Sequence, residues 1–349
     1  MSQTEAEASP TAAGEPILEI KDLTVHFPTE DGLVKAVDGL TVSLSPRETL
    51  GVVGESGSGK SVTFLTVMGL VTRKEAHITG QALFKGEDLL TMDPERLRKI
   101  RGDKIAMIFQ DPLTALNPVH RVGNQIAEVF QIHRGMSRAE GLKEAVQLLG
   151  LVGIPKPQER VRSYPHEFSG GMRQRAMIAM ALALSPDLLI ADEPTTALDV
   201  TVQAQILDLI DGLKNEFNAA VVMITHDLGV VAEHCENIMV MYAGRPVEFG
   251  DRYSIYDAPQ HPYTWGLLKS ISRITDSRDE RLQPIKGQPP SLINVPSGCP
   301  FNPRCPYVFD RCHTEVPELL AVDGHHSSAC HLAFSDRERI LKEVVLTQP

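Results

Sequence analysis

A run of glycine and serine residues that ends in a lysine is the part of the sequence best suited to chemistry. Residues 54–61 match the pattern G-x-x-x-x-G-K-[ST] at every fixed position and lie between a predicted strand and a predicted helix. Glycines let backbone N–H groups wrap around phosphates, Lys60 is expected to reach the β- and γ-phosphates of a nucleotide, and the Ser61 hydroxyl is expected to bind Mg²⁺. The predicted nucleotide-binding residues of this phosphate loop are Gly54, Glu55, Ser56, Gly57, Ser58, Gly59, Lys60 and Ser61.

Two acidic residues supply the other half of that chemistry. Asp192 and Glu193 follow an apolar run at 188–191 that has the composition of a buried strand. Asp192 can hold Mg²⁺ through water or through Ser61, and Glu193 can polarise an attacking water as a general base. Two acids at a strand end are common in isolation, but beside a phosphate loop they predict hydrolysis of a nucleoside triphosphate.

A second pair of glycines points to one family of ATPases. Ser169, Gly170 and Gly171 lie between Phe168 and Met172, where a hydroxyl and two amides at a helix start form another anion site. The segment resembles the L-S-G-G-Q signature of ABC ATPases, with Phe in place of Leu and Met in place of Gln. In that family the signature acts in trans and closes on the γ-phosphate held by the partner's phosphate loop.

The other motifs of the ABC family follow in order along the chain. Gln110 matches the Q-loop glutamine, which senses Mg²⁺ and attacking water and links to the transmembrane partner, and His226 matches the switch histidine that contacts the γ-phosphate. Asp199 ends a D-loop at 197–199, which crosses the dimer interface, and Phe27 matches the aromatic residue that stacks on adenine. The resemblance implies catalytic roles for Glu193, His226 and Gln110, a Mg²⁺ site at Ser61, Gln110 and Asp192, and ATP binding in trans by Ser169, Gly170, Gly171 and Asp199.

These residues need a sheet whose strand ends carry them. Apolar runs and helical periodicity alternate along the chain, which is typical of a largely parallel sheet with helices on both faces. The predicted strands are at 17–27, 34–37, 40–44, 49–53, 105–109, 188–191, 220–224, 238–242 and 246–249, and the predicted helices at 60–70, 121–151, 171–184, 202–217 and 228–234.

The ABC resemblance implies an α/β fold with a RecA-like P-loop core, an antiparallel β lobe and an inserted helical lobe. The cysteines near the C-terminus predict that a small Cys-rich C-terminal extension follows. We expect a disordered leader at 1–16 and a nucleotide-binding domain at 17–255, with its helical lobe at about 111–175. The extension is expected at 256–349.

Composition narrows the class of protein further. The chain has 349 residues, of which 42% are hydrophobic, and a formal net charge of −11, which disfavours a broad basic surface for nucleic acid. No apolar run approaches the roughly 18–20 residues that cross a bilayer, and 1–16 lacks the basic and apolar regions of a secretory signal. We expect a cytoplasmic protein that reaches a membrane only through partners.

Four of the five cysteines gather near the C-terminus. Cys299, Cys305, Cys312 and Cys330 have the spacing C-x5-C-x6-C-x17-C, which is neither that of zinc ribbons nor the common ferredoxin run. Four thiolates can bind a 4Fe–4S cluster or Zn²⁺, and free thiols are the third alternative. The segments 261–264 and 298–312 resemble the C-terminal extension of oligopeptide-importer ABC ATPases. Because members of that peptide-importer group that resemble this chain carry an iron–sulfur cluster in the extension, the resemblance favours the 4Fe–4S cluster.

Several features separate the classes of ABC ATPase. Chromosome and repair ATPases insert long coiled coils where this chain has only a short segment between Gln110 and Ser169, and translation factors carry two cassettes with a basic linker. Exporters usually fuse the cassette to membrane helices. The segments 111–118, 261–264 and 298–312 resemble the ATPases of dipeptide, oligopeptide and nickel importers.

That resemblance implies an ATP-hydrolysing subunit that powers peptide import from the cytoplasmic face of the cell membrane. The implied partners are a second ATPase subunit in a heterodimer or a homodimer, two transmembrane permeases and an extracytoplasmic solute-binding protein. Nickel, glutathione and oligosaccharides are alternative cargoes of the same machinery. Two alternatives from other classes are a soluble ABC ATPase that acts on nucleic acid and a scaffold that binds ATP without hydrolysing it, although Glu193 and His226 disfavour the scaffold.

Overall fold

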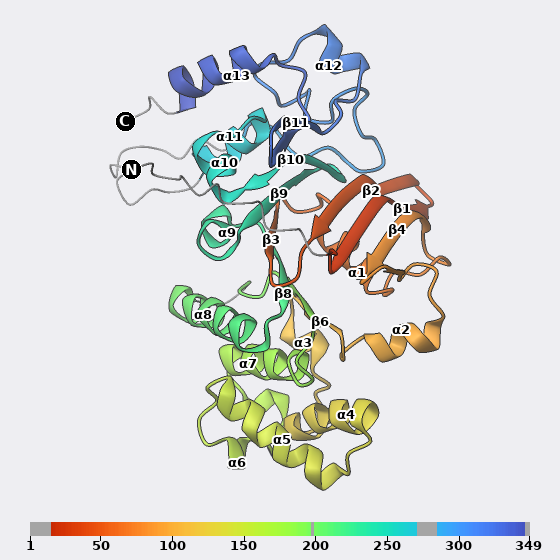
Figure 1. Ribbon diagram of the computed structural model, residues 1–349, viewed down its shortest axis with the longest axis vertical. Helices are drawn as coiled ribbons and strands as arrows, with labels where there is room; N and C mark the ends of the chain where they lie inside the picture. Colours follow the sequence, from red (N-terminus) through yellow and green to blue (C-terminus); the bar gives the residue numbers. More distant parts are fainter. Residues whose placement is uncertain (1–14, 197–198, 271–284, 346–349) are drawn as a thin grey trace, which may run out of the picture.

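The computed structural model of the chain describes residues 15–196, 199–270 and 285–345. A helical lobe lies at one end of this part of the chain and the C-terminal extension at the opposite end, with the sheets between them (Figure 1). Residues 1–14 of the predicted leader lie outside the described residues.

Parallel strands form the middle of the larger sheet, whose order is β11-β12-β10-β9-β3-β8-β7-β6. Every residue of β3 (Thr49–Val53), β7 (Leu188–Asp192) and β8 (Ala220–Thr225) is buried, as expected of strands that are covered on both faces. Burial on both faces explains the uninterrupted apolar runs from which these three strands were predicted. The remaining strands of this sheet are β6 (Ile105–Ile108), β9 (Asn237–Tyr242), β10 (Arg245–Asp251), β11 (Leu320–Asp323) and β12 (His326–Ser328).

The smaller sheet is antiparallel, as predicted for the β lobe, and has the order β2-β1-β4-β5. It contains β1 (Leu18–Thr29), β2 (Gly32–Leu44), β4 (His77–Phe84) and β5 (Glu87–Asp88). The prediction of two strands at 34–37 and 40–44 was wrong, because β2 continues through a register shift at Gly39, whose φ is 79°. The strands β4 and β5 were not predicted from the sequence.

Helices follow the strands of the larger sheet as the alternating pattern predicts. α1 (Lys60–Val67) follows β3, α8 (Val200–Phe217) follows β7, and α9 (Leu228–His234) follows β8. α1 ends before the predicted limit of 70 because Gly69 takes a left-handed φ of 63° and its N–H bonds the Thr66 carbonyl.

The helical lobe is built mainly from two helices that pack on each other, α4 (Val122–Arg134) and α5 (Arg138–Leu151). The predicted helical stretch 121–151 is divided because Gly135 ends α4 in the left-handed conformation and Ser137 opens α5 with a capping box. The region also contains α3 (Pro112–Ala115), α6 (Pro157–Arg160), η1 (Pro165–Glu167) and α7 (Gly170–Ala181), while α2 (Pro94–Ile100) lies outside it.

The C-terminal extension continues the larger sheet, because β12 pairs with β10 and β11 pairs with β12. Glu248 on β10 is fully buried and ties the two together by pairing with His326 of β12 at 2.8 Å. The helical elements of this region are α10 (Arg252–Asp257), α11 (Pro262–Lys269), α12 (Asp310–Thr314), α13 (Phe334–Ile340) and η2 (Leu341–Val345). Among the described residues, none of the helices has both the length and the apolar character needed to span a bilayer.

Candidate functional site

The predicted catalytic residues lie at one edge of the larger sheet. β3, β8, β7 and β6 are neighbours in that order, and the phosphate loop, His226, Asp192 with Glu193, and Gln110 occur at or just after their carboxyl ends. In open α/β sheets this is the edge at which ligands bind. The topology therefore gathers side chains that are far apart in the sequence.

The phosphate loop folds tightly between β3 and α1. A Cβ atom on Gly54 would lie 2.2 Å from the Met241 carbonyl oxygen, and one on Gly59 would lie 2.2 Å from that of Ala36. Both positions also have positive φ values, 154° and 99°. Only glycine fits at these two positions, which is the physical reason for the spacing of the motif.

Lys60 lies beneath the loop and is buried. Its Nζ donates to the carbonyl oxygens of Gly54 at 2.7 Å and Glu55 at 3.0 Å. Burial lowers the pKa of Lys60, and the nearby carboxylates of Glu193, Asp192 and Glu55 oppose that shift. The backbone of the phosphate loop thus holds the Lys60 amine, which is predicted to bind the phosphates of the nucleotide in the same loop.

Ser61 and Asp192 meet as the sequence predicted. The Ser61 hydroxyl donates to Asp192 Oδ1 at 2.8 Å. Burial raises the pKa of Asp192, and the hydrogen bond from Ser61 opposes that shift. A hydroxyl and a carboxylate are hard oxygen donors of the kind that Mg²⁺ prefers, so this pair fits the predicted metal.

Three side chains contact the Glu193 carboxylate. Gln110 Nε2 donates to Glu193 Oε2 at 2.9 Å, and His226 Nδ1 lies 3.5 Å from Glu193 Oε1. The Glu193 backbone takes a left-handed φ of 44°, and its N–H bonds the Ile224 carbonyl, which fixes the turn after β7. The Thr196 hydroxyl also donates to Glu193 at 2.8 Å, a contact that the sequence analysis missed because threonine three residues after an acid is common in turns.

The residues predicted to act in trans lie elsewhere. Ser169 caps α7 and accepts from the Met172 N–H at 3.4 Å, and Asp199 caps α8 and accepts from the Val202 N–H at 3.0 Å. Among the described residues, no hydrogen bond joins either side chain to the phosphate loop. Residues 197 and 198 of the D-loop lie outside the described residues.

Phe27, predicted to stack on adenine, lies near the end of β1. It pairs with Val34 of β2, is half-buried and packs against the hydrophobic core between the two sheets. Its role toward a nucleotide stays a prediction.

The four clustered cysteines surround one small cavity of about 10 Å³, close to the size of one water molecule. Burial raises the pKa of Cys299 to about 11 and that of Cys305 to about 12, and it also raises the pKa of Cys330. Among the described residues, no group of three or more His, Cys, Asp or Glu side chains is arranged to hold a metal ion. The donor set is thus chemically suitable, but its arrangement lends no support to an iron–sulfur cluster or Zn²⁺.

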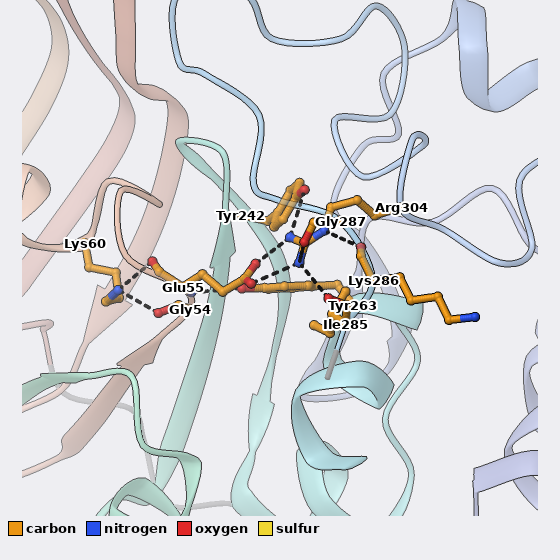
Figure 2. Close-up of polar contacts among 9 residues, drawn as sticks. All are labelled: Gly54, Glu55, Lys60, Tyr242, Tyr263, Ile285, Lys286, Gly287 and Arg304. Atoms are coloured by element: carbon orange, nitrogen blue, oxygen red, sulfur yellow. Dashed lines mark hydrogen bonds and ion pairs between the residues drawn. The ribbon is translucent and has the colours of Figure 1, made fainter. Parts of the chain in front are cut away.

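Two residues of the extension touch the phosphate loop, and the sequence analysis did not anticipate them. Arg304 forms an ion pair with Glu55, and the Tyr263 hydroxyl accepts a hydrogen bond from the Glu55 N–H (Figure 2). Tyr263 lies in the His-Pro-Tyr-Thr segment and Arg304 lies directly before Cys305, so both were part of recognised segments without an assigned role.

Comparison with protein families and curated proteins gives consistent matches. Residues 37–196 match the ABC transporter family, and residues 247–312 match the C-terminal region of oligopeptide/dipeptide transporters. The oligopeptide transport ATP-binding protein OppD of Salmonella typhimurium is 51% identical over 330 residues, which cover 95% of this chain and 98% of the relative. OppD of Escherichia coli is 51% identical over 319 residues, covering 91% of this chain and 94% of the relative.

Solved structures show the same core. A dimeric bacterial ABC transporter cassette has a TM-score of 0.61 and 28% identity, covering 67% of this chain and 98% of the cassette. A dimeric ATP-binding cassette in a post-hydrolysis state bound to ADP and Pi has a TM-score of 0.61 and 27% identity, over the same shares of the two chains.

Proposed function

This chain belongs to the ABC transporter family, in the group with the oligopeptide/dipeptide transporter C-terminal region, and from that premise we propose how it powers peptide import. It is a transport-coupled ATPase. The observation that supports the proposed mechanism best is the contact of Glu193 with Gln110 and His226 beside the Ser61–Asp192 pair.

In this mechanism the phosphate loop binds the triphosphate of ATP through its backbone N–H groups and Lys60. Ser61, Asp192 and Gln110 are the residues that would hold Mg²⁺, which neutralises charge on the β- and γ-phosphates. Phe27 stacks on adenine.

Glu193 is the general base for the attacking water. Gln110 and Thr196 donate to its carboxylate, which fixes the direction in which the free lone pairs point. His226 is 64% exposed and lies next to Glu193, so it is free to contact the γ-phosphate. Proton transfer from water to Glu193 accompanies attack on the γ-phosphorus, and ADP leaves.

The site is completed by a second cassette. Ser169, Gly170, Gly171 and Asp199 of one cassette act on the ATP held by the phosphate loop of the other. A dimer is supported by the two dimeric cassettes that share this fold, and the partner is either a related chain or a second copy, with a related chain favoured.

The membrane assembly consists of two such cassettes, two permeases and an extracytoplasmic solute-binding protein. The cassettes lie on the cytoplasmic face of the cell membrane, and their closure moves the permeases through the region around Gln110 and the helical lobe. Peptides are the proposed cargo because the curated relatives are oligopeptide transport proteins. Nickel, glutathione and oligosaccharides are the alternative cargoes.

Reconstitution tests this function. The chain is purified with its permeases, placed in proteoliposomes with the solute-binding protein, and assayed for ATP hydrolysis with trialanine, Ni²⁺, glutathione or maltotriose. Stimulation by trialanine alone is expected. Stimulation by Ni²⁺, glutathione or maltotriose would identify that compound as the cargo in place of peptide. Stimulation of the isolated chain by DNA or RNA would favour a nucleic-acid function over transport.

The four-cysteine cluster is also proposed to hold a 4Fe–4S cluster, with Zn²⁺ as the alternative. The four thiols face one cavity, and binding would require them to lose their protons and move together. Anaerobic purification followed by iron and acid-labile sulfide analysis tests this. Visible thiolate-to-iron absorption with matching iron and sulfide is expected, whereas a colourless protein with stoichiometric zinc would contradict it.

A further inference from the structure

Arg304 binds the side chain of the phosphate-loop residue Glu55 in a bidentate ion pair. Its Nη1 lies 2.6 Å from Glu55 Oε2 and its Nη2 lies 3.0 Å from Glu55 Oε1. The Arg304 side chain is only 4% exposed. The Glu55 side chain is 29% exposed. Two charge-assisted hydrogen bonds from one buried guanidinium group are geometrically specific, and a lysine cannot reproduce them.

The remaining N–H groups of Arg304 donate to neighbouring backbone carbonyl oxygens and to a tyrosine hydroxyl. Nε donates to the Lys286 carbonyl at 3.1 Å, and Nη2 donates to the Gly287 carbonyl at 3.3 Å (Figure 2). Nη1 also lies 3.4 Å from the Tyr242 hydroxyl. The guanidinium group is therefore saturated with partners, and it joins 285–287 to the phosphate loop.

Tyr263 contacts the same loop residue through its backbone. Its hydroxyl accepts from the Glu55 N–H at 2.9 Å, and the side chain is fully buried. The ring packs against Tyr242 and Phe301, with centroid separations of 4.6 Å and 5.4 Å. Burial raises the pKa of Tyr263, so the oxygen remains a hydroxyl.

Glu55 links Arg304 and Tyr263 to Lys60 through three different groups of the same residue. Its N–H faces Tyr263, its carboxylate faces Arg304, and its carbonyl oxygen accepts from Lys60 Nζ at 3.0 Å. One loop residue thus joins two side chains of the extension to the amine expected to bind the β- and γ-phosphates. The positive charge of Arg304 also offsets the Glu55 carboxylate, which would otherwise repel a triphosphate bound to the same loop.

We propose that Arg304 and Tyr263 are positioning residues for ATP hydrolysis, through which the C-terminal extension holds the phosphate loop in its ATP-binding geometry. The proposal rests on the proposed function of the site as an ATPase. Neither side chain touches the reacting atoms; both act through Glu55.

Steady-state ATP hydrolysis by the assembled transporter tests the proposal. Arg304→Gln removes the charge at similar size and should raise the KM for Mg-ATP by about tenfold with a smaller change in kcat, because it leaves Glu55 charged and displaces the loop. Arg304→Lys should give an intermediate KM. Tyr263→Phe removes one hydroxyl and should raise KM by about threefold.

A double variant separates positioning from loss of folding. Glu55→Gln with Arg304→Gln removes both charges, so the repulsion between Glu55 and the triphosphate disappears, but the loop still lacks the ion pair that positions it. KM should therefore recover only in part, and the remaining increase measures the loss of positioning. A variant that had only lost stability would gain no such rescue. Arg311→Gln is the matched control, because Arg311 pairs with Glu315 on the exposed surface of the same extension, and its KM should not change.

A KM within twofold of the unaltered value in both Arg304→Gln and Tyr263→Phe would overturn the proposal. If Arg304→Gln does not fold, Tyr263→Phe decides alone: a raised KM supports positioning and an unchanged KM overturns it. Failure of the proposed function is distinct, since it would show as absent ATP hydrolysis in the unaltered assembly.

Discussion

The proposed catalytic edge, which is formed by the carboxyl ends of β3, β8, β7 and β6 of the larger sheet, and the C-terminal extension place their side chains in different ways. At the edge, the parallel strands β3, β8 and β7 end side by side, and tight turns at Gly54 and Glu193 fix the residues that follow. In the extension, Cys299 and Cys305 lie in the described residues 285–309, which contain no helix or strand, whereas Cys312 lies in the short helix α12 and Cys330 follows β12.

The two regions should therefore respond differently to side-chain substitutions. Positions at the edge are set by the backbone of the sheet, so side-chain changes there should alter chemistry more than stability. Positions in the extension are set by side-chain packing, so changes there should alter stability first. Arg304 is the exception, because it belongs to the extension and contacts the phosphate loop.

The largest effect is expected from Lys60→Ala at the catalytic edge. Loss of this charge next to the phosphates should lower ATP hydrolysis by about 100-fold or more. Stability should change little, because Lys60 is buried at a cost that lowers its pKa. Steady-state ATPase assays and thermal melting measure the two effects, and Lys85→Ala is the control, since Lys85 pairs with Asp187 on the surface. A melting temperature that falls in step with activity would break the comparison.

A smaller effect is expected from Cys299→Ser in the extension. In protein prepared without a bound cluster or metal ion, Cys299 is 9% exposed and burial raises the pKa of its thiol to about 11, so it packs as a small neutral group. A buried serine hydroxyl without a partner should cost about 1–3 kcal/mol of unfolding free energy. Denaturant unfolding measures it, with Ser297→Ala, an exposed neighbour, as the control. An unchanged unfolding free energy in the serine variant would show that packing does not set this region.

Acid should destabilise the extension through His261. Burial, with the positive charge of Arg337, lowers the pKa of His261 from 6.5 to about 3, and its Nδ1 accepts from the Tyr263 N–H at 3.1 Å. Between those two values the unfolded chain binds a proton that the folded chain does not, so stability falls as pH falls below 6.5.

The loss should be about 1 kcal/mol over the first pH unit below that value. Melting in a series of buffers measures it, and His261→Asn, which can keep the helix cap without titrating, should lose this part of the pH dependence. An unaltered acid slope in the asparagine variant would rule out His261 as its source.

The smallest effect is expected at Cys235, in the core beneath β3. The side chain is 1% exposed and burial raises the pKa of its thiol to about 12. It should therefore resist iodoacetamide in the folded protein at pH 8 and react once the chain is unfolded. Mass spectrometry of the modified peptides measures this, and rapid labelling of the native protein at Cys235 would contradict it.

The residues proposed for catalysis could be selected from the sequence because each lies in a short contiguous motif at a strand end; their roles stay predictions. The contact of Ser61 with Asp192 was expected from those motifs, whereas the contact of Gln110 with Glu193 was not predicted from the sequence. The long bulged strand β2 and the strand β4 were harder to predict, because Gly39 interrupts one pattern and β4 alternates weakly.

The contacts between the extension and the phosphate loop could not be predicted in this way. Glu55 and Arg304 are 249 positions apart in the sequence, and nothing in either local pattern identifies the other as its partner. Only the folding of the extension onto β10 brings Arg304 and Tyr263 to the loop. The same holds for the arrangement of the cysteines, which depends on packing.

Glu193→Gln tests the central claim most directly, namely that Glu193 drives hydrolysis in a site shared by two cassettes. The variant is incubated with Mg²⁺ and radiolabelled ATP, alone and with its partner cassette, and separated by size-exclusion chromatography. We predict a dimer that retains unhydrolysed ATP. Undiminished turnover, or a chain that binds ATP only as a monomer, would contradict the account.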